Sequence, residues 1–291
     1  MSEGNAREGS KDEFHENWVA RNESYYNHWT PGHPLNQIQF AFRNHYEIFV
    51  EIMKPSELGT CLEVGCGRGS LSCHFASHGW DVTLLDYSPA VIDIAKQIFE
   101  TNKLKGQFIV DDANKLPFDN SSYDLVFSIG LLEHFEDSSQ TLKQQWRVLK
   151  PGGWLFAYIV PHRPQNVQKY FRWVNRILKA TMGVFAPKKS APEKQDVYRN
   201  DYGSQAYLPI IRALEPEKIF VSGIYSMPMI SHSPEFPFSL LPTFMERILV
   251  KVFSLSVSIR KKITGRHGWL CSEPMGQAFL IGAKKSSNED T

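Results

Sequence analysis

Apolar residues recur along this chain in two alternating patterns, short apolar-rich runs and stripes spaced by three or four residues. The runs at 61–64, 80–85, 107–110, 123–128 and 154–160 predict buried strands. Between them, stripes such as Val91, Ile94, Ala95, Ile98 and Phe99 predict helices with one face toward a core. Two further strands are expected at 219–225 and 277–283, with the last one antiparallel. The pattern therefore predicts an α/β fold, a doubly wound seven-stranded Rossmann-like sheet.

The first run leads directly into a glycine turn. Gly65, Gly67 and Gly69 alternate along the chain, and a helix is expected over 70–77. Glycines adopt turn conformations closed to other residues, and a helix N-terminus adds N–H groups and partial positive charge. A dinucleotide turn usually has the spacing G-x-G-x-x-G, whereas this one has G-x-G-x-G. Glu63 precedes it, and a carboxylate there suits a cationic or zwitterionic ligand better than a pyrophosphate.

Carboxylates follow the next two strands. Asp86 ends the second strand seventeen residues after Gly69, close to the spacing at which a carboxylate reaches a ribose. Tyr87 beside it is placed to flank a nucleoside base. Asp111 and Asp112 follow the third strand. Since parallel strands end at one edge of a sheet, these side chains are expected to lie on one rim.

Taken in order, these segments resemble the class I S-adenosylmethionine-dependent methyltransferases. Residues 63–69 match the motif (D/E)-x-G-x-G-x-G, and residues 112–118 match the run D-A-x-x-L-P-F. After the fourth strand the chain reads Ser-Ile-Gly-Leu at 128–131, unlike the (D/N)-P-P-(Y/F) of enzymes that methylate DNA amines. The run Leu-Leu-Glu-His-Phe at 131–135 and a Lys-Pro-Gly-Gly turn at 150–153 resemble the small-molecule branch, which includes quinone and sterol methyltransferases.

The resemblance implies S-adenosylmethionine as cofactor and assigns roles on the rim. It implies that Asp112 accepts a hydrogen bond from the exocyclic amine of adenine and that Ala113 N–H donates to a ring nitrogen. Asp111 is then expected to be a strand-end or helix-cap residue. The predicted cofactor residues are Glu63, Gly65, Cys66, Gly67, Gly69, Asp86, Tyr87, Asp112, Ala113 and Ser128. The resemblance covers about residues 60–160.

The acceptor side is less determined by the sequence. If the acceptor needs a general base, the candidates are His134, His162, Tyr202 and His232. His134 has a second interpretation, as a residue that pins the loop over the cofactor. The aromatic residues ahead of the first strand form part of a cap over the ligand or pack a helix onto the sheet; they include Tyr25, Tyr26, His28 and Trp29.

Composition narrows the class of protein and its partners. The 291 residues carry a net charge of +1, so no overall field selects nucleic acid, and a small-molecule substrate is expected. The four cysteines lack metal-site spacing and, with a polar N-terminus, indicate a cytoplasmic chain. We expect a disordered start (1–14), an N-terminal helical cap (15–58), a cofactor-binding core (59–160), a basic helical insertion (161–218) and a C-terminal part (219–291). The sequence leaves the oligomeric state undetermined.

Two segments outside the matched core leave alternatives open. Residues 161–200 carry a net charge of +7 and form either a solvated basic face or a contact with an anionic group. An apolar-rich helix is expected over 244–263, and Glu246, Arg247 and Lys251 prevent it from spanning a bilayer. It caps the substrate pocket, packs on the sheet, or lies on a membrane surface as in a lipid or quinone methyltransferase.

The sequence therefore predicts methyl transfer to a small nucleophile with an apolar or aromatic body, with or without an acidic group. One alternative is a catalytically silent binding or regulatory subunit of the same fold. A nicotinamide enzyme is disfavoured by the glycine spacing and by Glu63.

Overall fold

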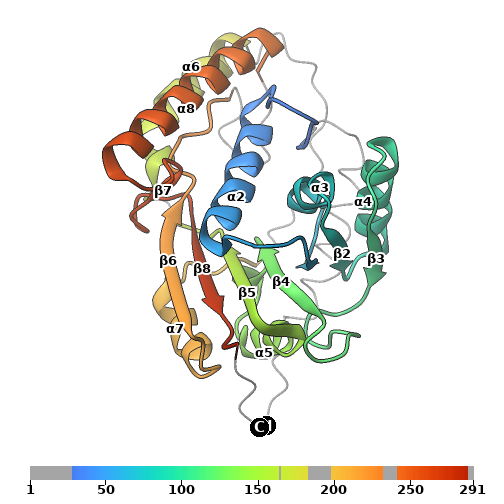
Figure 1. Ribbon diagram of the computed structural model, residues 1–291. Helices are drawn as coiled ribbons and strands as arrows, with labels where there is room; N and C mark the ends of the chain where they lie inside the picture. Colours follow the sequence, from blue (N-terminus) through green and yellow to red (C-terminus); the bar gives the residue numbers. More distant parts are fainter. Residues whose placement is uncertain (1–27, 164, 183–197, 232–240, 288–291) are drawn as a thin grey trace.

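One mixed sheet organises the structure, a computed structural model that describes residues 28–163, 165–182, 198–231 and 241–287. Its eight strands run in the order β3-β2-β1-β4-β5-β8-β6-β7. The first five are parallel neighbours, and β8 pairs antiparallel with both β5 and β6 (Figure 1). The strands are β1 (Thr60–Val64), β2 (Asp81–Asp86), β3 (Gln107–Val110), β4 (Tyr123–Ile129), β5 (Leu149–Ile159), β6 (Lys218–Ile224), β7 (Leu270–Cys271) and β8 (Ala278–Lys284).

The predicted doubly wound α/β class is confirmed, with an antiparallel strand among the last ones. The eighth strand is β7, which pairs with the end of β6 over two residues. A segment of two residues carries no periodicity, so the apolar pattern could not reveal it.

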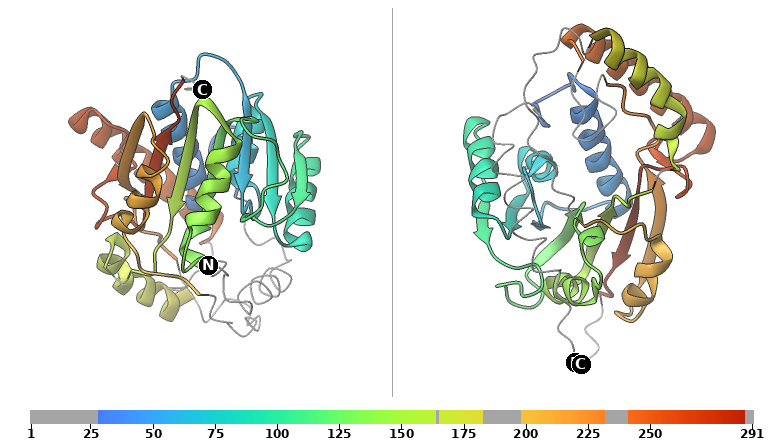
Figure 2. Two further views of the ribbon diagram at one scale, coloured as in Figure 1. Left: turned by 90° about the horizontal axis from the view of Figure 1, so that it is seen from below. Right: turned by 180° about the vertical axis from the view of Figure 1, so that it is seen from behind.

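Helices cover both faces of the sheet (Figure 2). The α-helices are α2 (Gln37–Met53), α3 (Ser70–Ser77), α4 (Pro89–Thr101), α5 (Ser139–Val148), α6 (Arg172–Met182), α7 (Ser204–Arg212) and α8 (Thr243–Thr264), with short 3-10 turns η1 (Leu132–His134) and η2 (Val167–Phe171). Phe49, Phe75 and Phe99 from α2, α3 and α4 share one core, while α5 and α7 enter a second core on the other face. Successive strand residues alternate between the two cores, as Cys61 and Leu62 do.

Local signals place the helix starts as the sequence predicts. Ser88 caps α4 by accepting a hydrogen bond from Val91 N–H at 3.4 Å, and Pro89 occupies the first turn. The left-handed Gly79 follows α3, and α8 lies within one residue of its expected bounds.

Two expectations need correction. The predicted turn at 150–153 lies within β5, where Tyr123 pairs with Leu149 but Leu125 pairs with Trp154, so these residues bulge from the ladder. Gly152 N–H is held there by Lys285 O at 3.1 Å. The second concerns detail within the predicted helical insertion (161–218), where the apolar pattern did not outline α7, with Pro209 inside it; this helix packs against β8 as a core helix. The expected start at 1–14 lies outside the described residues.

Candidate functional site

The glycine turn joins β1 to α3 and is held against the end of β2. Gly65 N–H and Cys66 N–H both donate to Leu85 O, at 2.8 and 3.0 Å. Gly65, Gly67 and Gly69 all have positive φ, between 52° and 68°. A Cβ at Gly69 would also strike Leu84. The turn therefore needs glycine at this position for both conformation and space.

Asp86 ties the turn to β2. Its Oδ2 accepts from Gly67 N–H and its Oδ1 from Ser88 N–H, each at 3.1 Å. Burial raises the pKa of this carboxyl, and the backbone donors oppose that rise. Each carboxylate oxygen has more than one lone pair, so both can accept further hydrogen bonds from a ligand's hydroxyl groups. Tyr87 beside it is 50% exposed, which leaves ring surface for a nucleoside base.

Glu63 lies beneath the turn and is directed to α3. Its Oε2 accepts from Ser72 Oγ at 2.6 Å and from Ser72 N–H at 3.3 Å. Burial raises the pKa of Glu63 to about 8, and the bonds from Ser72 oppose that rise. Much of this carboxyl is thus protonated at neutral pH, and a cation at the turn would favour its ionised form. Direct contact with a ligand stays a prediction.

The aspartates after β3 shape the next part of the rim. Asp111 N–H continues the strand pairing by donating to Asp86 O at 3.1 Å, and Asp111 Oδ1 accepts from Asp112 N–H at 2.7 Å. Asp112 Oδ1 accepts from Asn114 N–H at 2.9 Å, while Ala113 is buried. Asp111 thus acts as a local cap, and the adenine role of Asp112 stays a prediction.

Beyond β4, buried polar atoms lack partners. Ser128 Oγ and Glu133 Oε2 have no hydrogen-bond partner among the described residues. Glu133 Oε1 accepts from Val160 N–H at 3.2 Å, so the carboxyl spans the carboxyl ends of β4 and β5. Burial raises the pKa of Glu133 to about 7, against the opposing effect of Arg199. Buried polar atoms are normally paired, so such atoms on a rim indicate a place for a ligand or water.

Three of the four candidates for the general base lie within the described residues, and their environments differ. His134 Nδ1 donates to Tyr198 O at 2.7 Å, and burial lowers the pKa of His134 to about 4. This geometry matches the interpretation in which His134 pins a loop. His162 is exposed just after β5, and Tyr202 is 42% exposed ahead of α7.

Of the N-terminal aromatic candidates, His28 and Trp29 are described. His28 Nδ1 lies 3.2 Å from Ser70 Oγ at the start of α3, and burial with nearby Arg68 lowers the pKa of His28 to about 3. Trp29 is buried edge-on against His74, as a packing residue would be. Tyr25 and Tyr26 lie outside the described residues, as does His232.

A buried aromatic cluster, which the sequence analysis did not identify, faces the ends of β5 and β6. His45 of α2 has its ring centroid 4.7 Å from that of Tyr158, 6.0 Å from Tyr225 and 6.3 Å from Trp269. Neither ring nitrogen of His45 has a hydrogen-bond partner among the described residues, and the same holds for Trp269 Nε1. Burial lowers the pKa of His45 to about 3. In the sequence, His45 is one member of an apolar helix stripe. The pattern therefore gives no sign that its ring nitrogens are buried without partners among the described residues.

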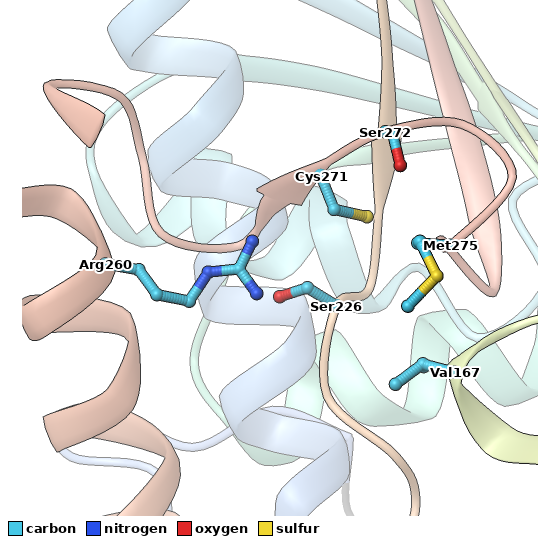
Figure 3. Close-up of a pocket in the computed structure, with 6 residues that line it drawn as sticks. All are labelled: Val167, Ser226, Arg260, Cys271, Ser272 and Met275. Carbon is cyan, nitrogen blue, oxygen red and sulfur yellow. The ribbon is translucent and has the colours of Figure 1, made fainter. Parts of the chain in front are cut away.

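A cavity of about 260 Å³ adjoins the segments that carry Tyr225 and Trp269, since Ser226 and Cys271 help to line it (Figure 3). It is lined by Val167, Ser226, Arg260, Cys271, Ser272 and Met275. Arg260 Nη2 donates to Leu270 O at 2.8 Å, and no carboxylate pairs with this guanidinium within the described ranges. Burial raises the pKa of Cys271 to about 11, partly opposed by Arg260. The cavity therefore offers a positive charge and hydroxyl groups to a ligand.

Comparison with known proteins identifies the core. The family described as "Methyltransferase domain" matches residues 62–157, which run from β1 into β5. Residues 62–157 thus resemble a methyltransferase domain. Its relatives include a ubiquinone biosynthesis O-methyltransferase of Coxiella burnetii, 39% identical over 95 residues that make up 33% of this chain and 41% of the relative. A demethylmenaquinone methyltransferase of Chlorobaculum tepidum is 34% identical over 130 residues, 43% of this chain and 51% of that protein.

The chain thus spans about half or less of the length of these curated relatives. A solved structure supports the fold across a larger part. The methyltransferase in complex with the Trm112 activator of Haloferax volcanii aligns with a TM-score of 0.55 at 17% identity, over 97% of this chain and 100% of that one. At this identity the match concerns the fold alone.

The methyltransferase domain explains the geometry of the rim. S-adenosylmethionine is the methyl donor of this family, as the sequence resemblance implied. The residues present fit it. The turn presents bare backbone, since a Cβ at Gly65 would lie 2.8 Å from Leu131 and one at Gly69 would strike Leu84. Asp86 has lone pairs for ribose hydroxyls, and Ser128 Oγ at the neighbouring strand end is buried without a hydrogen-bond partner among the described residues. Within the described residues no group of three or more His, Cys, Asp or Glu side chains is arranged to hold a metal.

Proposed function

We propose that this protein transfers a methyl group from S-adenosylmethionine to a small-molecule acceptor with an apolar or aromatic body. The proposal rests on the polar side chains at the edge of the sheet where the parallel strands end, within and beside the matched domain. The turn and Asp86 provide the cofactor half. Ser128 Oγ, Glu133 Oε2 and the ring nitrogens of His45 are buried without hydrogen-bond partners among the described residues. Polar atoms left unpaired in a buried rim have room to act on an acceptor.

The bound cofactor supplies a methyl group already activated by its sulfonium. The chain's own task is to hold the acceptor in line with that group and to exclude water. Tyr158 and Trp269 are almost fully buried, and Tyr225 packs on Trp269 with centroids 5.1 Å apart. These buried rings exclude water from one side of the proposed acceptor site.

Glu133 is the residue best suited to accept the acceptor's proton. Its pKa of about 7 leaves a large fraction ionised at neutral pH, and it sits at the ends of β4 and β5. The pKa of His45, about 3, makes it a weak base, but its neutral ring can accept a hydrogen bond from a hydroxyl group. In this arrangement Glu133 takes the proton and His45 orients the acceptor.

A quinol-like or phenolic acceptor fits these residues. The curated relatives are named for ubiquinone and menaquinone chemistry, which supports a ring acceptor with an apolar tail. Arg260 in the adjacent cavity has no carboxylate partner among the described residues, which supports an acidic substituent on such a ring.

Two measurements test the proposal in sequence. S-adenosylmethionine or its demethylated product should raise the melting temperature of the full chain, whereas NADH should not. Incubation with methyl-labelled cofactor and a phenol bearing a short isoprenoid tail should then give a labelled product. Cofactor binding without label transfer to any phenol, quinol or sterol acceptor would favour the silent binding subunit instead.

Glu133→Gln separates the proposed proton acceptor from a packing residue. In the native protein kcat should rise as the pH increases through about 7, since the ionised form is the base. In the variant kcat should fall and lose this pH dependence, with cofactor affinity unchanged. A retained pH profile would remove Glu133 from this role.

A further inference from the structure

Helix α8 carries apolar residues on two opposite faces. Val250 and Phe253 are buried in the core, and Glu246 beside them accepts from Gln37 N–H at 2.9 Å. The other face holds an apolar strip that is 47–77% exposed, made up of Phe244, Ile248, Val252, Leu255, Ile259 and Ile263. At about 100° per residue the strip falls within an arc of roughly 100°, opposite the buried face. Contiguous apolar patches of this kind on a protein surface mark interaction sites.

Helix α6 repeats the feature at the same end of the molecule (Figures 1 and 2). Trp173 and Ile177 of α6 are 62% and 54% exposed, and Tyr170, just ahead of them, is 62% exposed. Their spacing of three and four residues puts them on one side of the helical segment. Both helices lie at the carboxyl end of β6, where the arrow of that strand points in Figure 1.

The charged side chains that α6 and α8 present at the surface are all basic. Together α6 and α8 contain eight basic residues, and their one acidic residue, Glu246, is buried. Lys251 and Lys262 are exposed and lie within the same turns as the strip, with Arg247 at its edge. Lys261 is ion-paired with Glu51 of α2, at 2.9 Å.

We propose that the strip of α8, with the exposed apolar side chains of α6 at the same end of the molecule, binds the surface of an anionic phospholipid bilayer. Apolar side chains would enter the headgroup boundary while the flanking bases meet lipid phosphates. Charge complementarity selects this occupant. A second copy of the chain would bring like-charged bases together. The chain's own residues 1–27 include Phe14, Trp18 and Tyr25, so cover of the strip by this segment is one outcome of the test below.

The contact is peripheral and independent of the proposed methyl transfer. No helix in the described part of the chain is long and apolar enough to cross a bilayer. Helix α8 packs on α2, the helix that carries His45, through the face opposite the strip. Membrane binding through the strip would therefore leave this packing in place.

Co-sedimentation of the full chain with vesicles tests the proposal. The protein should sediment with phosphatidylcholine vesicles that contain phosphatidylglycerol, bind phosphatidylcholine alone much less, and be released by added salt. The double variant Ile248→Ser/Leu255→Ser should bind the anionic vesicles at least roughly tenfold more weakly, because it removes apolar contact from the middle of the strip. The variant Arg247→Glu/Lys251→Glu should lose the preference for anionic lipid.

A matched control removes exposed apolar side chains at the opposite rim. Leu58 and Ile219 lie near the amino ends of β1 and β6 and are 63% and 38% exposed. Leu58→Ser/Ile219→Ser should leave vesicle binding unchanged, and all variants should keep native melting temperature and cofactor affinity.

Three results would overturn the proposal. The first is equal binding by the strip variant and the native chain. The second is a concentration-dependent dimer in light scattering that the strip variant abolishes without lipid, which would assign the strip to a second copy. The third is vesicle binding only after residues 1–27 are removed, which would assign it to the chain's own N-terminal segment.

Discussion

The two halves of the rim differ in how their polar groups are satisfied. In the cofactor half, Asp86 and Glu63 accept hydrogen bonds from the turn, from Ser88 and from α3. In the acceptor half, the ring nitrogens of His45, Glu133 Oε2 and Trp269 Nε1 are buried without partners within the described residues. The cofactor half is therefore complete as a scaffold. The acceptor half retains unsatisfied groups, as a site does when its ligand provides the missing bonds.

The largest loss of stability should come from a substitution in the cofactor half. Gly69→Ala places a Cβ against Leu84 at a φ of 64° and should cost roughly 3 kcal/mol of unfolding free energy. Gly32 has a φ of 89° with open space around it, so Gly32→Ala should cost only about 1 kcal/mol. Urea unfolding of both variants gives the comparison. Equal losses would show that the turn has room to relax.

Glu63→Gln should change how stability depends on pH. The pKa of Glu63 is raised to about 8 in the folded chain, above its unfolded value, so its contribution is full at low pH and is lost as the pH rises through 8. Relative to the native chain, the variant should gain on the order of 2 kcal/mol between pH 5 and pH 8. Unfolding measured at both pH values decides this, with the exposed Glu100→Gln as control. A constant difference across the range would contradict the burial of a protonated Glu63.

Asp86→Asn tests the cofactor contact. The change keeps one acceptor for Gly67 N–H but removes the charge, and should weaken S-adenosylmethionine binding by roughly 1.5–3 kcal/mol. Calorimetric titration measures the affinity, and the parallel variant Asp111→Asn controls for a neighbouring carboxylate. Unchanged affinity in Asp86→Asn would place the ribose elsewhere.

The smallest effect on stability should come from the acceptor half and have the opposite sign. His45→Leu removes a buried group with no hydrogen-bond partner among the described residues, so the unfolding free energy should rise by about 1 kcal/mol. Turnover should fall at the same time while cofactor affinity stays native. A stable variant with full turnover would make His45 a packing residue.

The sequence predicted the cofactor half closely because its signals are local. A glycine turn, a strand ending in Asp86 and the Ser88-Pro89 cap are each readable over a few residues, and the structure has them in place. The acceptor half is assembled from α2, β5, β6 and the segment before β7, which are distant in sequence. No local pattern marks His45 as unpaired or Glu133 as buried, and the exposed strip of α8 reads like any apolar helix face until its packing is known. Long-range packing decided these features.

The central claim is that the turn and Asp86 bind the cofactor so that its reactive end faces the acceptor half. A crystal structure with S-adenosylhomocysteine tests it most directly. The account predicts ribose hydroxyls within hydrogen-bond distance of Asp86, adenine beside Tyr87, and the sulfur directed toward Ser128 and Glu133. A nucleoside bound away from Asp86, or with its sulfur turned from the ends of β4 and β5, would contradict it.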